Sequence, residues 1–372
     1  MRDAVKVFQY MLEEKSERIR ASKQKMLDIY NGKAPQSPYF EFAVTSGISN
    51  EKSVWAHSLF ENELSREMQK IAQMLEITKG FDYVPSVSVD ACSDSGYVAR
   101  LLGSRTEDFK ENGIHITSHA IETADDVDKL VLPDLDKDPF YNQMCEHVKF
   151  LTDALDGCVD IVYPQLQGPA TNSFRVMPQE EALISCITDP EQMEKLGNIV
   201  TRIAIDVLKG LIRAAGGSRY FRPRARFYQP DYVKGLFVDD WISVISPSSY
   251  MEIYRSSWEM MYREIGPIFL HTCGPIDHCT ELLTSLPGLV GMEATYIKGQ
   301  SKTVNDLASI AKKLHGKIAF GSFGGPFGNV VQDEENMNSY TLKELSSNGY
   351  FAIQAHGAPE YAAELVERLG LI

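Results

Sequence analysis

The chain has 372 residues and a formal net charge of −14 at pH 7. This acidic balance argues against nucleic-acid binding, which needs a basic surface, and it is compatible with a soluble cytoplasmic enzyme. Apolar residues make up 44% of the chain and charged residues 24%, so the sequence predicts a large folded core.

The sequence also excludes several other classes of protein. It has no apolar run of about 18 residues, so we expect no spanning helix and no membrane association. The N-terminus carries charges throughout and lacks the apolar segment of a signal peptide. Six cysteines in a chain of this length indicate reduced thiols, one or two of which bind metal, rather than a disulfide framework.

The first segment of the chain differs from the rest. A charged amphipathic pattern over residues 3–30 predicts a helix that ends near Asn31 and Gly32. We therefore expect an N-terminal helical extension at residues 1–32, followed by one domain at residues 33–372. The alternation of segments described below predicts that this domain is a barrel. Residues 92–136 do not fit a minimal barrel and are predicted to be an insertion with a short extended piece at 115–119.

After the extension, strand-like and helix-like segments alternate. The predicted strands are eight short apolar runs: Tyr39–Val44, Tyr83–Val89, Asp160–Gln165, Gly235–Val238, Ile268–His271, Leu289–Glu293, Ile318–Phe320 and Phe351–Gln354. The predicted helices lie at about 54–78, 137–156, 178–215, 247–264, 276–285, 303–314, 334–347 and 359–369. Regular alternation predicts parallel strands joined by right-handed crossovers, and eight such units close into an α/β fold of the (β/α)8 TIM-barrel type.

Polar residues follow the ends of several predicted strands. In a barrel of this type the chemistry lies at the carboxyl ends of the strands, so these residues are candidates for a site. We expect a substrate to be bound by Asp90, Gln165, Gln167 and Tyr296. The candidates for catalysis or metal binding are Asp239, Asp240, His271, Cys273, Glu293 and His356.

His271 and Cys273 form the most informative pair. They lie two apart at the end of one predicted strand, so their side chains point to the same face. A third ligand from another strand end, with His356 in the matching place, would leave a fourth position open, as in catalytic zinc sites. Cys279 and His278 are alternatives in the next predicted helix, and a buried histidine beside a buried cysteine is the interpretation without metal.

The carboxylates leave a choice open. Asp239 and Asp240 are adjacent, so on a strand only one of them faces the barrel interior, and the sequence does not say which. Glu293 is a candidate acid or base, or a further metal ligand. 

From residue 159 onward the motifs resemble those of the uroporphyrinogen decarboxylase superfamily, whose fold is a (β/α)8 barrel. The resemblance covers about half of the chain well and the first 150 residues loosely. It rests on Gln167-Gly168-Pro169, Asp239-Asp240-Trp241, His271-Thr272-Cys273-Gly274 and Gly357-Ala358-Pro359.

Two branches of this superfamily differ in chemistry. The decarboxylase branch holds substrate carboxylates with an N-terminal arginine-rich motif, whereas residues 40–47 of this chain contain no arginine. The cobamide-dependent methyltransferase branch binds zinc with a His-x-Cys pair and a distant cysteine. His271 and Cys273 match that pair, and His356 falls where the branch has its cysteine. The chain therefore resembles the methyltransferase branch, with one ligand changed.

The change of ligand affects the charge of the implied site. Two histidines and one thiolate leave Zn²⁺ with a net charge of +1, which makes it a stronger Lewis acid for an ether or alcohol oxygen. The resemblance thus implies methyl transfer between a small methylated, O-methyl substrate and a corrinoid protein, with Asp239, Asp240 or Glu293 positioning substrate or managing a proton. Methyl transfer to a thiol stays open, as do a non-catalytic corrinoid- or ligand-binding barrel and a metal-free decarboxylase with Arg222, Arg224 and Arg226 turned inward.

Overall fold

The structure is a computed structural model of the chain, in which most strands form two parallel sheets with helices outside them. It describes residues 1–33, 39–44, 59–89, 96–109, 113–163, 166–217, 219–223, 227–296, 305, 307–324 and 351–357. In these residues no helix is both long enough and apolar enough to span a bilayer.

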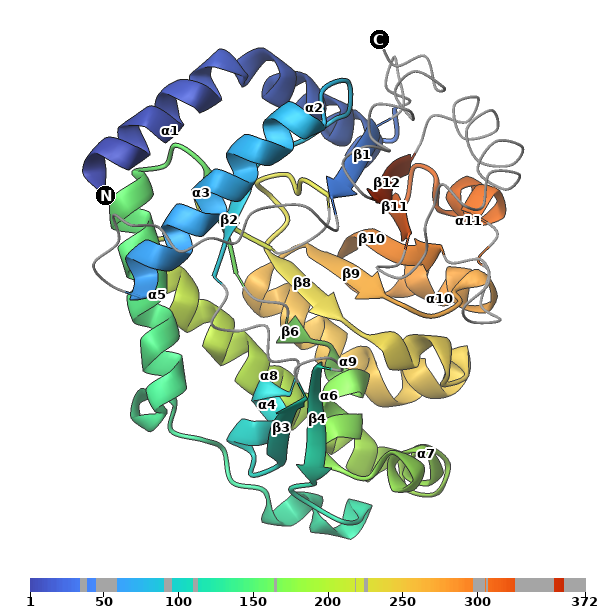
Figure 1. The fold of residues 1–372 in the computed structure, drawn as a ribbon. Helices are drawn as coiled ribbons and strands as arrows, with labels where there is room; N and C mark the ends of the chain where they lie inside the picture. The colour runs from blue at the N-terminus through green and yellow to red at the C-terminus, as the bar shows by residue number, and fades with distance from the viewer. Residues whose placement is uncertain are drawn as a thin grey trace.

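The N-terminal extension consists of two helices, α1 (Arg2–Glu14) and α2 (Ser16–Tyr30), joined at Lys15 (Figure 1). The prediction of a single helix over residues 3–30 was therefore wrong. The two helices bury apolar side chains in two different core clusters. The buried apolar side chains are Val5, Phe8 and Leu12 on α1, and Met26 and Ile29 on α2, where they pack against Tyr39 and Ala319 at the start of two strands.

The main sheet has seven strands in the order β1-β12-β11-β10-β9-β8-β6, and every pair in it is parallel. Its order follows the chain backwards from β12 to β8, as expected when each strand is joined to its neighbour by a helical crossover. The strands are β1 (Tyr39–Val44), β6 (Leu166–Gln167), β8 (Gly235–Val238), β9 (Ile268–Thr272), β10 (Leu289–Tyr296), β11 (Ala319–Gly324) and β12 (Phe351–Gly357).

A second parallel sheet contains β2 (Ser86–Ser88), β5 (Asp160–Val162) and β7 (Phe221–Arg222) in the order β2-β5-β7. A parallel bridge between Glu41 and Asp82 places the chain leading to β2 beside β1. β5 is followed along the chain by β6 of the main sheet. The described residues therefore show two parallel sheets in mixed α/β order, without a continuous ladder that closes them.

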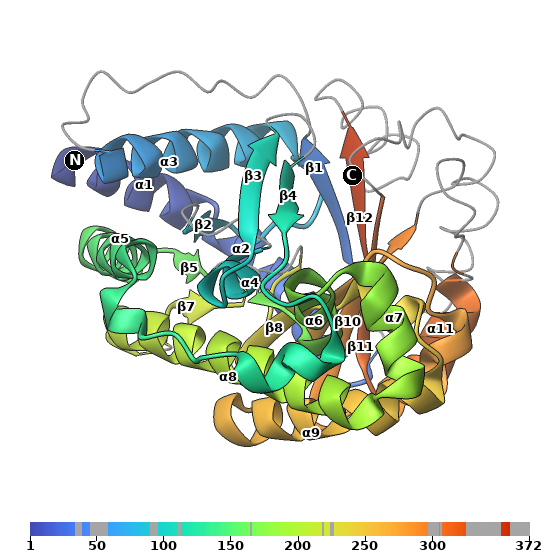
Figure 2. The ribbon, with the colours of Figure 1, turned by 90° about the horizontal axis from the view of Figure 1, so that it is seen from below.

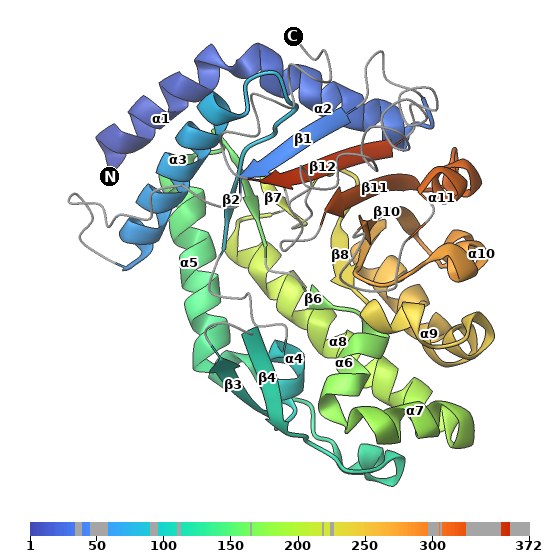
Figure 3. The same ribbon diagram turned by 45° about the vertical axis from the view of Figure 1, so that its right-hand side comes forward.

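Helices lie on the outside of these strands, and Figure 3 shows α9, α10 and α11 beside β8 to β11. The predicted helix at 178–215 is interrupted at Asp189, because Pro190 begins a new helix and cannot continue the preceding one. The helices are α3 (Leu59–Ile77), α5 (Pro139–Leu155), α6 (Pro169–Val176), α7 (Gln179–Thr188), α8 (Pro190–Ala214), α9 (Pro247–Ile265), α10 (Thr280–Ser285) and α11 (Leu307–Leu314). The predicted helices at 334–347 and 359–369 lie outside the described residues.

The segment predicted as an insertion contains a short helix, α4 (Tyr97–Leu101), and an antiparallel hairpin (Figure 2). The extended piece expected at 115–119 lies mostly in β4 (Gly113–Ser118) and pairs with β3 (Arg105–Phe109), a strand that the sequence analysis did not predict. Short 3-10 turns follow at Ala124–Lys129 and Leu135–Lys137.

Large aromatic side chains fill the core between α6 and α9. Phe174, Tyr250, Tyr254 and Trp258 are each no more than 1% exposed. The rings of Tyr250 and Tyr254 lie 5.2 Å apart between centroids, in a tilted arrangement. Tyr250 in this layer donates a hydrogen bond to Asp239, in the chain that follows β8.

Candidate metal centre

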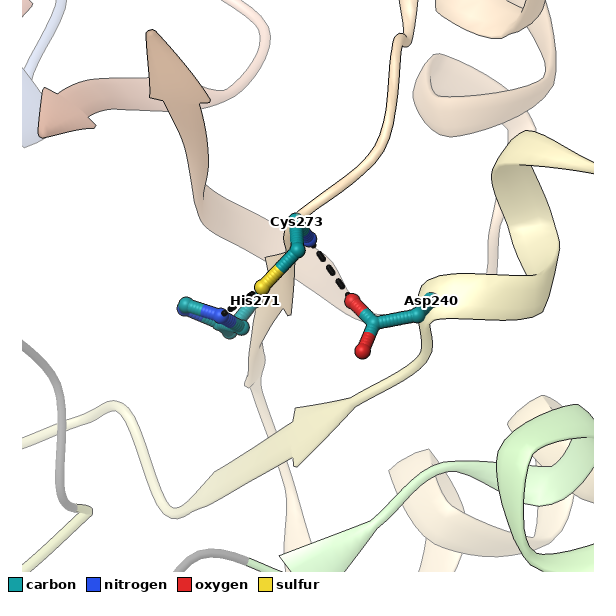
Figure 4. Close-up of side chains that lie close together, drawn as sticks. All are labelled: Asp240, His271 and Cys273. Atoms are coloured by element: carbon teal, nitrogen blue, oxygen red, sulfur yellow. Dashed lines mark hydrogen bonds between the residues drawn. The ribbon is translucent and has the colours of Figure 1, made fainter. Parts of the chain in front are cut away.

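The end of β9 brings an imidazole and a thiol together. His271 lies in this fully buried strand and is 4% exposed, whereas Cys273 follows the strand and is exposed. The Nε2 atom of His271 lies 3.3 Å from Sγ of Cys273 (Figure 4). The predicted same-face geometry is therefore present at the carboxyl end of a parallel strand.

The donor atoms of this pair fit zinc. A tetrahedral zinc with Zn–N of about 2.05 Å and Zn–S of about 2.3 Å sets these two donors about 3.6 Å apart. The observed 3.3 Å is close to that span. Zinc also binds the side chains of histidine and cysteine readily, whereas calcium and magnesium prefer oxygen ligands.

Glu293 holds the other nitrogen of the imidazole. It lies opposite His271 in the register of β10 and β9, and its Oε1 lies 2.7 Å from Nδ1 of His271. Metal-binding histidines commonly donate their second N–H to a carboxylate, which fixes the tautomer and the ring orientation. Because Glu293 takes Nδ1, Nε2 is left to face Cys273.

The same contacts set the charge of His271 in the metal-free chain. Burial alone disfavours the imidazolium, but hydrogen bonds to Cys273 and Glu293 and their negative charges outweigh it and raise the pKa of His271 to about 10. A metal ion bound at Nε2 must therefore displace a proton from this nitrogen.

Asp240 is the third residue of the group. It begins a 3-10 turn, Asp240–Ser243, directly after β8, and its Oδ1 accepts a hydrogen bond of 2.7 Å from the backbone N–H of Cys273. Ligand atoms of Asp240, His271 and Cys273 all lie within 4.8 Å of one another (Figure 4). The chain thus presents a carboxylate, an imidazole and a thiol that can share one metal ion.

Asp239 lies in a different environment. Its carboxylate is 0% exposed and accepts hydrogen bonds from the N–H groups of Ala170 and Thr171, from the Thr171 hydroxyl and from Tyr250. Burial outweighs these hydrogen bonds and raises the pKa of Asp239 to about 6. The structure therefore brings Asp240, and not Asp239, into the group with His271 and Cys273.

The remaining residues predicted for the site have varied positions. Gln167 is buried at the end of β6, where its backbone carbonyl accepts a hydrogen bond from the Asn172 side chain. Tyr296 ends β10, and His356 pairs with Ala43 in the ladder of β12 and β1, but the side chains of Tyr296 and His356 lie outside the described part of the structure. Asp90 and Gln165 lie outside the described residues altogether.

The alternative ligands point elsewhere. Cys279 is fully buried and its thiol donates to the carbonyl of Ile276, and burial raises the pKa of this thiol to about 12. His278 is exposed in the turn before α10. Neither belongs to the group of ligand atoms around Cys273.

The arginine-rich stretch is only partly described. Arg222 is paired with two carboxylates, since its Nε lies 2.9 Å from Asp160 and its Nη1 lies 2.6 Å from Asp231. Its charge is therefore matched within the protein rather than presented to a substrate carboxylate. Arg224 and Arg226 lie outside the described residues.

Thr171 is a site residue that the sequence analysis did not identify. It lies in the first turn of α6, and its hydroxyl contacts both Asp239 and the backbone N–H of Asp240. Pro169 at the first position of a helix was the available signal, because proline is favoured there. The pairing of this helix end with the chain after β8 has no local signal in the sequence.

Two comparisons with known proteins concern the family and the fold of the chain. The sequence matches the family model described as uroporphyrinogen decarboxylase (URO-D) over residues 88–222, which include β5, β6 and α6 to α8. No curated protein sequence matches the chain. Among solved structures, a methyltransferase from Methanosarcina mazei has a similar fold, with a TM-score of 0.62 and 16% sequence identity over 94% of this chain and 98% of that one. The family model matches residues 88–222, which is less than half of the chain, and the solved structure shows a shared fold.

Proposed function

We propose that the chain is a zinc-dependent methyltransferase, which moves a methyl group between a small methylated substrate and a corrinoid carried by a partner protein. The observation that supports this proposal is the pairing of His271 Nε2 with Cys273 Sγ at 3.3 Å, with Glu293 on the opposite ring nitrogen. The fold similarity to a methyltransferase from Methanosarcina mazei points in the same direction. We propose an O-methyl compound as the methylated substrate.

The proposal includes a closed barrel. The bridge between Glu41 and Asp82 joins β1 to the chain before β2, and β5 leads directly into β6. We therefore take the two parallel sheets as parts of one (β/α)8 barrel. In such a barrel the carboxyl ends of β8, β9 and β10 share one rim, where active sites of this fold class lie.

Each residue of the group has a distinct part in this proposal. His271 and Cys273 hold the metal, and Glu293 keeps the imidazole in the orientation that presents Nε2. When bound, zinc supplies Lewis-acid polarisation of the substrate atom that carries the methyl group. Asp240, which lies beside Cys273 at the exposed end of the group, is placed either to bind the metal or to position the substrate.

The identity of the third ligand sets the charge of the site. With His356, one thiolate leaves Zn²⁺ at a net charge of +1, which favours polarising the oxygen of an O-methyl substrate. With Asp240, a thiolate and a carboxylate together neutralise the ion. A neutral site favours a bound thiolate as methyl acceptor, so the observed position of Asp240 supports thiol methylation as a second candidate function.

Metal analysis of purified variants tests the proposal. We expect about one zinc per chain in the wild type and loss of zinc in His271→Ala and Cys273→Ser. His278→Ala is the matched control, since it removes an exposed histidine from the following turn. Comparison of Asp240→Asn with His356→Ala then identifies the third ligand, because the ligand's removal lowers zinc content and the other substitution does not.

Activity is measured on the same samples. Reduced cobalamin with a methoxylated aromatic acid tests O-demethylation, and methylcobalamin with a small thiol tests the second candidate. We expect methyl transfer in the zinc-loaded wild type and its loss in Cys273→Ser. Full activity of a zinc-free wild-type protein would overturn the proposal.

A further inference from the structure

We propose that Thr171 and Asp239 are positioning residues for the metal centre, and that they act on it through Asp240. The inference rests on the proposed zinc site. It assigns to Asp239 a supporting role rather than a catalytic one, and it gives a role to a threonine far from β9 in the sequence. Four consecutive hydrogen-bonded residues carry it: Asp239, Thr171, Asp240 and Cys273.

The first link is a buried carboxylate at a helix start. Oδ1 of Asp239 accepts from the Thr171 N–H at 2.8 Å, and Oδ2 accepts from the Ala170 N–H at 3.2 Å. These N–H groups in the first turn of α6 have no partner within the helix, and the helix dipole there favours negative charge. Asp239 therefore fixes α6 against the chain that leaves β8.

The second link is the Thr171 hydroxyl, which has one hydrogen and two contacts. Oγ1 lies 2.9 Å from Oδ1 of Asp239 and 3.0 Å from the backbone N–H of Asp240. An ionised carboxylate only accepts and an N–H only donates, so the hydroxyl must donate to Asp239 and accept from Asp240. Both directions are determined, and a methyl group in place of the hydroxyl loses both bonds.

The third link reaches the metal ligands. With its backbone N–H held by Thr171, Asp240 directs Oδ1 to the N–H of Cys273 at 2.7 Å. The backbone N–H of Asp239 also donates to the carbonyl of His271 at 3.0 Å. The backbones of both proposed ligands, His271 in β9 and Cys273 just after it, are thus hydrogen-bonded to Asp239 and Asp240.

The surroundings leave little freedom for this chain of contacts. Thr171 is 3% exposed and Asp239 is 0% exposed. Tyr250 donates to Oδ2 of Asp239 at 2.7 Å and itself accepts from the indole N–H of Trp258 at 2.9 Å. Buried and fully hydrogen-bonded groups are rigid, which is what a metal site needs from the residues behind its ligands.

A substitution at Thr171 separates positioning from simple structural support. Thr171→Val keeps the shape of the side chain and removes the hydroxyl, whereas Thr171→Ser keeps the hydroxyl. Ser173→Ala is the matched control, because Ser173 is fully buried in the same helix and its hydroxyl donates to Pro169, away from Asp240. Tyr250→Phe is a second variant, which weakens the hold on Asp239 without touching Thr171.

The measurements are zinc affinity by chelator competition, the thiolate-to-cobalt absorption of the Co²⁺-substituted protein, and the melting temperature. We expect Thr171→Val to bind zinc about 10-fold more weakly and to change the cobalt spectrum, as typically follows loss of a residue that supports a metal ligand. Tyr250→Phe should change the zinc affinity and the cobalt spectrum in the same direction. Thr171→Ser should keep both close to those of the wild type, and Ser173→Ala should change only the melting temperature.

Two outcomes would overturn the inference, and they are distinguishable. If Thr171→Val and Tyr250→Phe lower the melting temperature as Ser173→Ala does but bind zinc like the wild type, the network has only a structural role and the proposed function stands. If the wild type itself binds neither zinc nor Co²⁺, the proposed function fails and this inference fails with it.

Discussion

The carboxylate of Glu293 reaches from β10 to His271 on β9, where its Oε1 lies 2.7 Å from Nδ1 of the imidazole. The two side chains are 0% and 4% exposed, so water does not compete for this contact. The contact assigns the second ring nitrogen to the exposed side of the site, where Cys273 lies. Glu293 thus orients His271 in the described structure.

We expect Glu293→Ala to weaken zinc binding by about 10- to 100-fold, the range found when residues behind metal ligands are removed. Glu293→Gln should have a smaller effect, since its amide oxygen still accepts from Nδ1 but carries no charge. Zinc affinity by chelator competition is the measurement. Glu281→Ala, at an exposed position of α10, is the control, and wild-type affinity in Glu293→Ala would contradict the assigned role.

Gly274 allows the chain after Cys273 to approach the turn that carries Asp240. A Cβ on Gly274 would lie 2.0 Å from Oγ and 2.4 Å from Cβ of Ser243. We expect Gly274→Ala to destabilise the fold by about 1–3 kcal/mol, as overpacking usually does, and to reduce zinc affinity.

The double variant Gly274→Ala/Ser243→Gly removes the Oγ and Cβ atoms of Ser243 that the new methyl group would meet. It should recover part of the lost stability and part of the lost zinc affinity. A thermodynamic cycle of chemical denaturation and zinc binding measures the coupling between the two sites. Additive effects of the two substitutions would show that the close approach does not matter.

Glu264, the penultimate residue of α9, provides a test by pH. Its carboxylate accepts from Arg202 Nη1 at 2.6 Å and from Lys209 at 2.7 Å, and these hydrogen bonds and charges hold the pKa of Glu264 at about 2. The folded pKa lies below the ordinary value of 4.5, so the fold favours the ionised form. The stabilisation is therefore complete above pH 4.5 and is lost as the pH falls through about 2.

We expect Glu264→Gln to lose about 1–2 kcal/mol of unfolding free energy at pH 7, a value reduced for the partial exposure of the groups, and to approach the wild type at low pH. Urea denaturation between pH 7 and pH 2.5 measures this. Glu259→Gln, which removes an exposed partner of Arg255, is the control and should change stability little at any pH. If Glu264→Gln lowered the unfolding free energy by the same amount at every pH, this would contradict the role assigned to the ionised carboxylate.

Arg18 fastens the N-terminal extension to the rest of the fold. Its guanidinium donates to the carbonyls of Leu75 and Phe81, both at 2.9 Å, and to Thr78. These carbonyls lie at the end of α3 and just beyond it, where the helix dipole favours a cation.

We expect Arg18→Ala to cost about 2–4 kcal/mol, since it leaves several acceptors without their donor, and Arg18→Lys to recover little, because lysine lacks the planar fork. Chemical denaturation is the measurement. Arg20→Ala, at an exposed position on the same helix, should stay within about 0.5 kcal/mol of the wild type. Equal losses in the Ala variants at positions 18 and 20 would show that Arg18 has no special role.

The alternation of strands and helices was largely predictable because its main signals are local, whereas the closed barrel stays a prediction. Short apolar runs between helical stretches marked β1, β8, β9 and β10 within a few residues of their ends. The break at Lys15 was not predictable, because it depends on which parts of the core α1 and α2 contact. The β3 strand was also missed, since Arg105–Phe109 is polar and gains its structure from pairing with β4.

The candidate site was predictable in part for the same reason. His271 and Cys273 lie on one strand, so their spacing alone predicts a shared face. The choice of Asp240 over Asp239 could be made only once the position of α6 was known. The N–H and the hydroxyl of Thr171 in α6 hydrogen-bond the Asp239 carboxylate, which therefore faces away from the metal group. The role of Glu293 depends on the register of β10 against β9, which the sequence does not encode locally. His356 as a ligand stays a prediction.

X-ray absorption at the zinc edge of the purified wild-type protein tests the central claim most directly. The account predicts about one zinc per chain, with a first shell of one sulfur at about 2.3 Å and nitrogen or oxygen donors at about 2.0–2.1 Å. Cys273→Ser should lose the bound zinc, whereas Cys279→Ser should keep the zinc and its sulfur ligand. Absence of bound zinc, or a zinc shell without sulfur, would contradict the assignment of His271 and Cys273 as the metal centre.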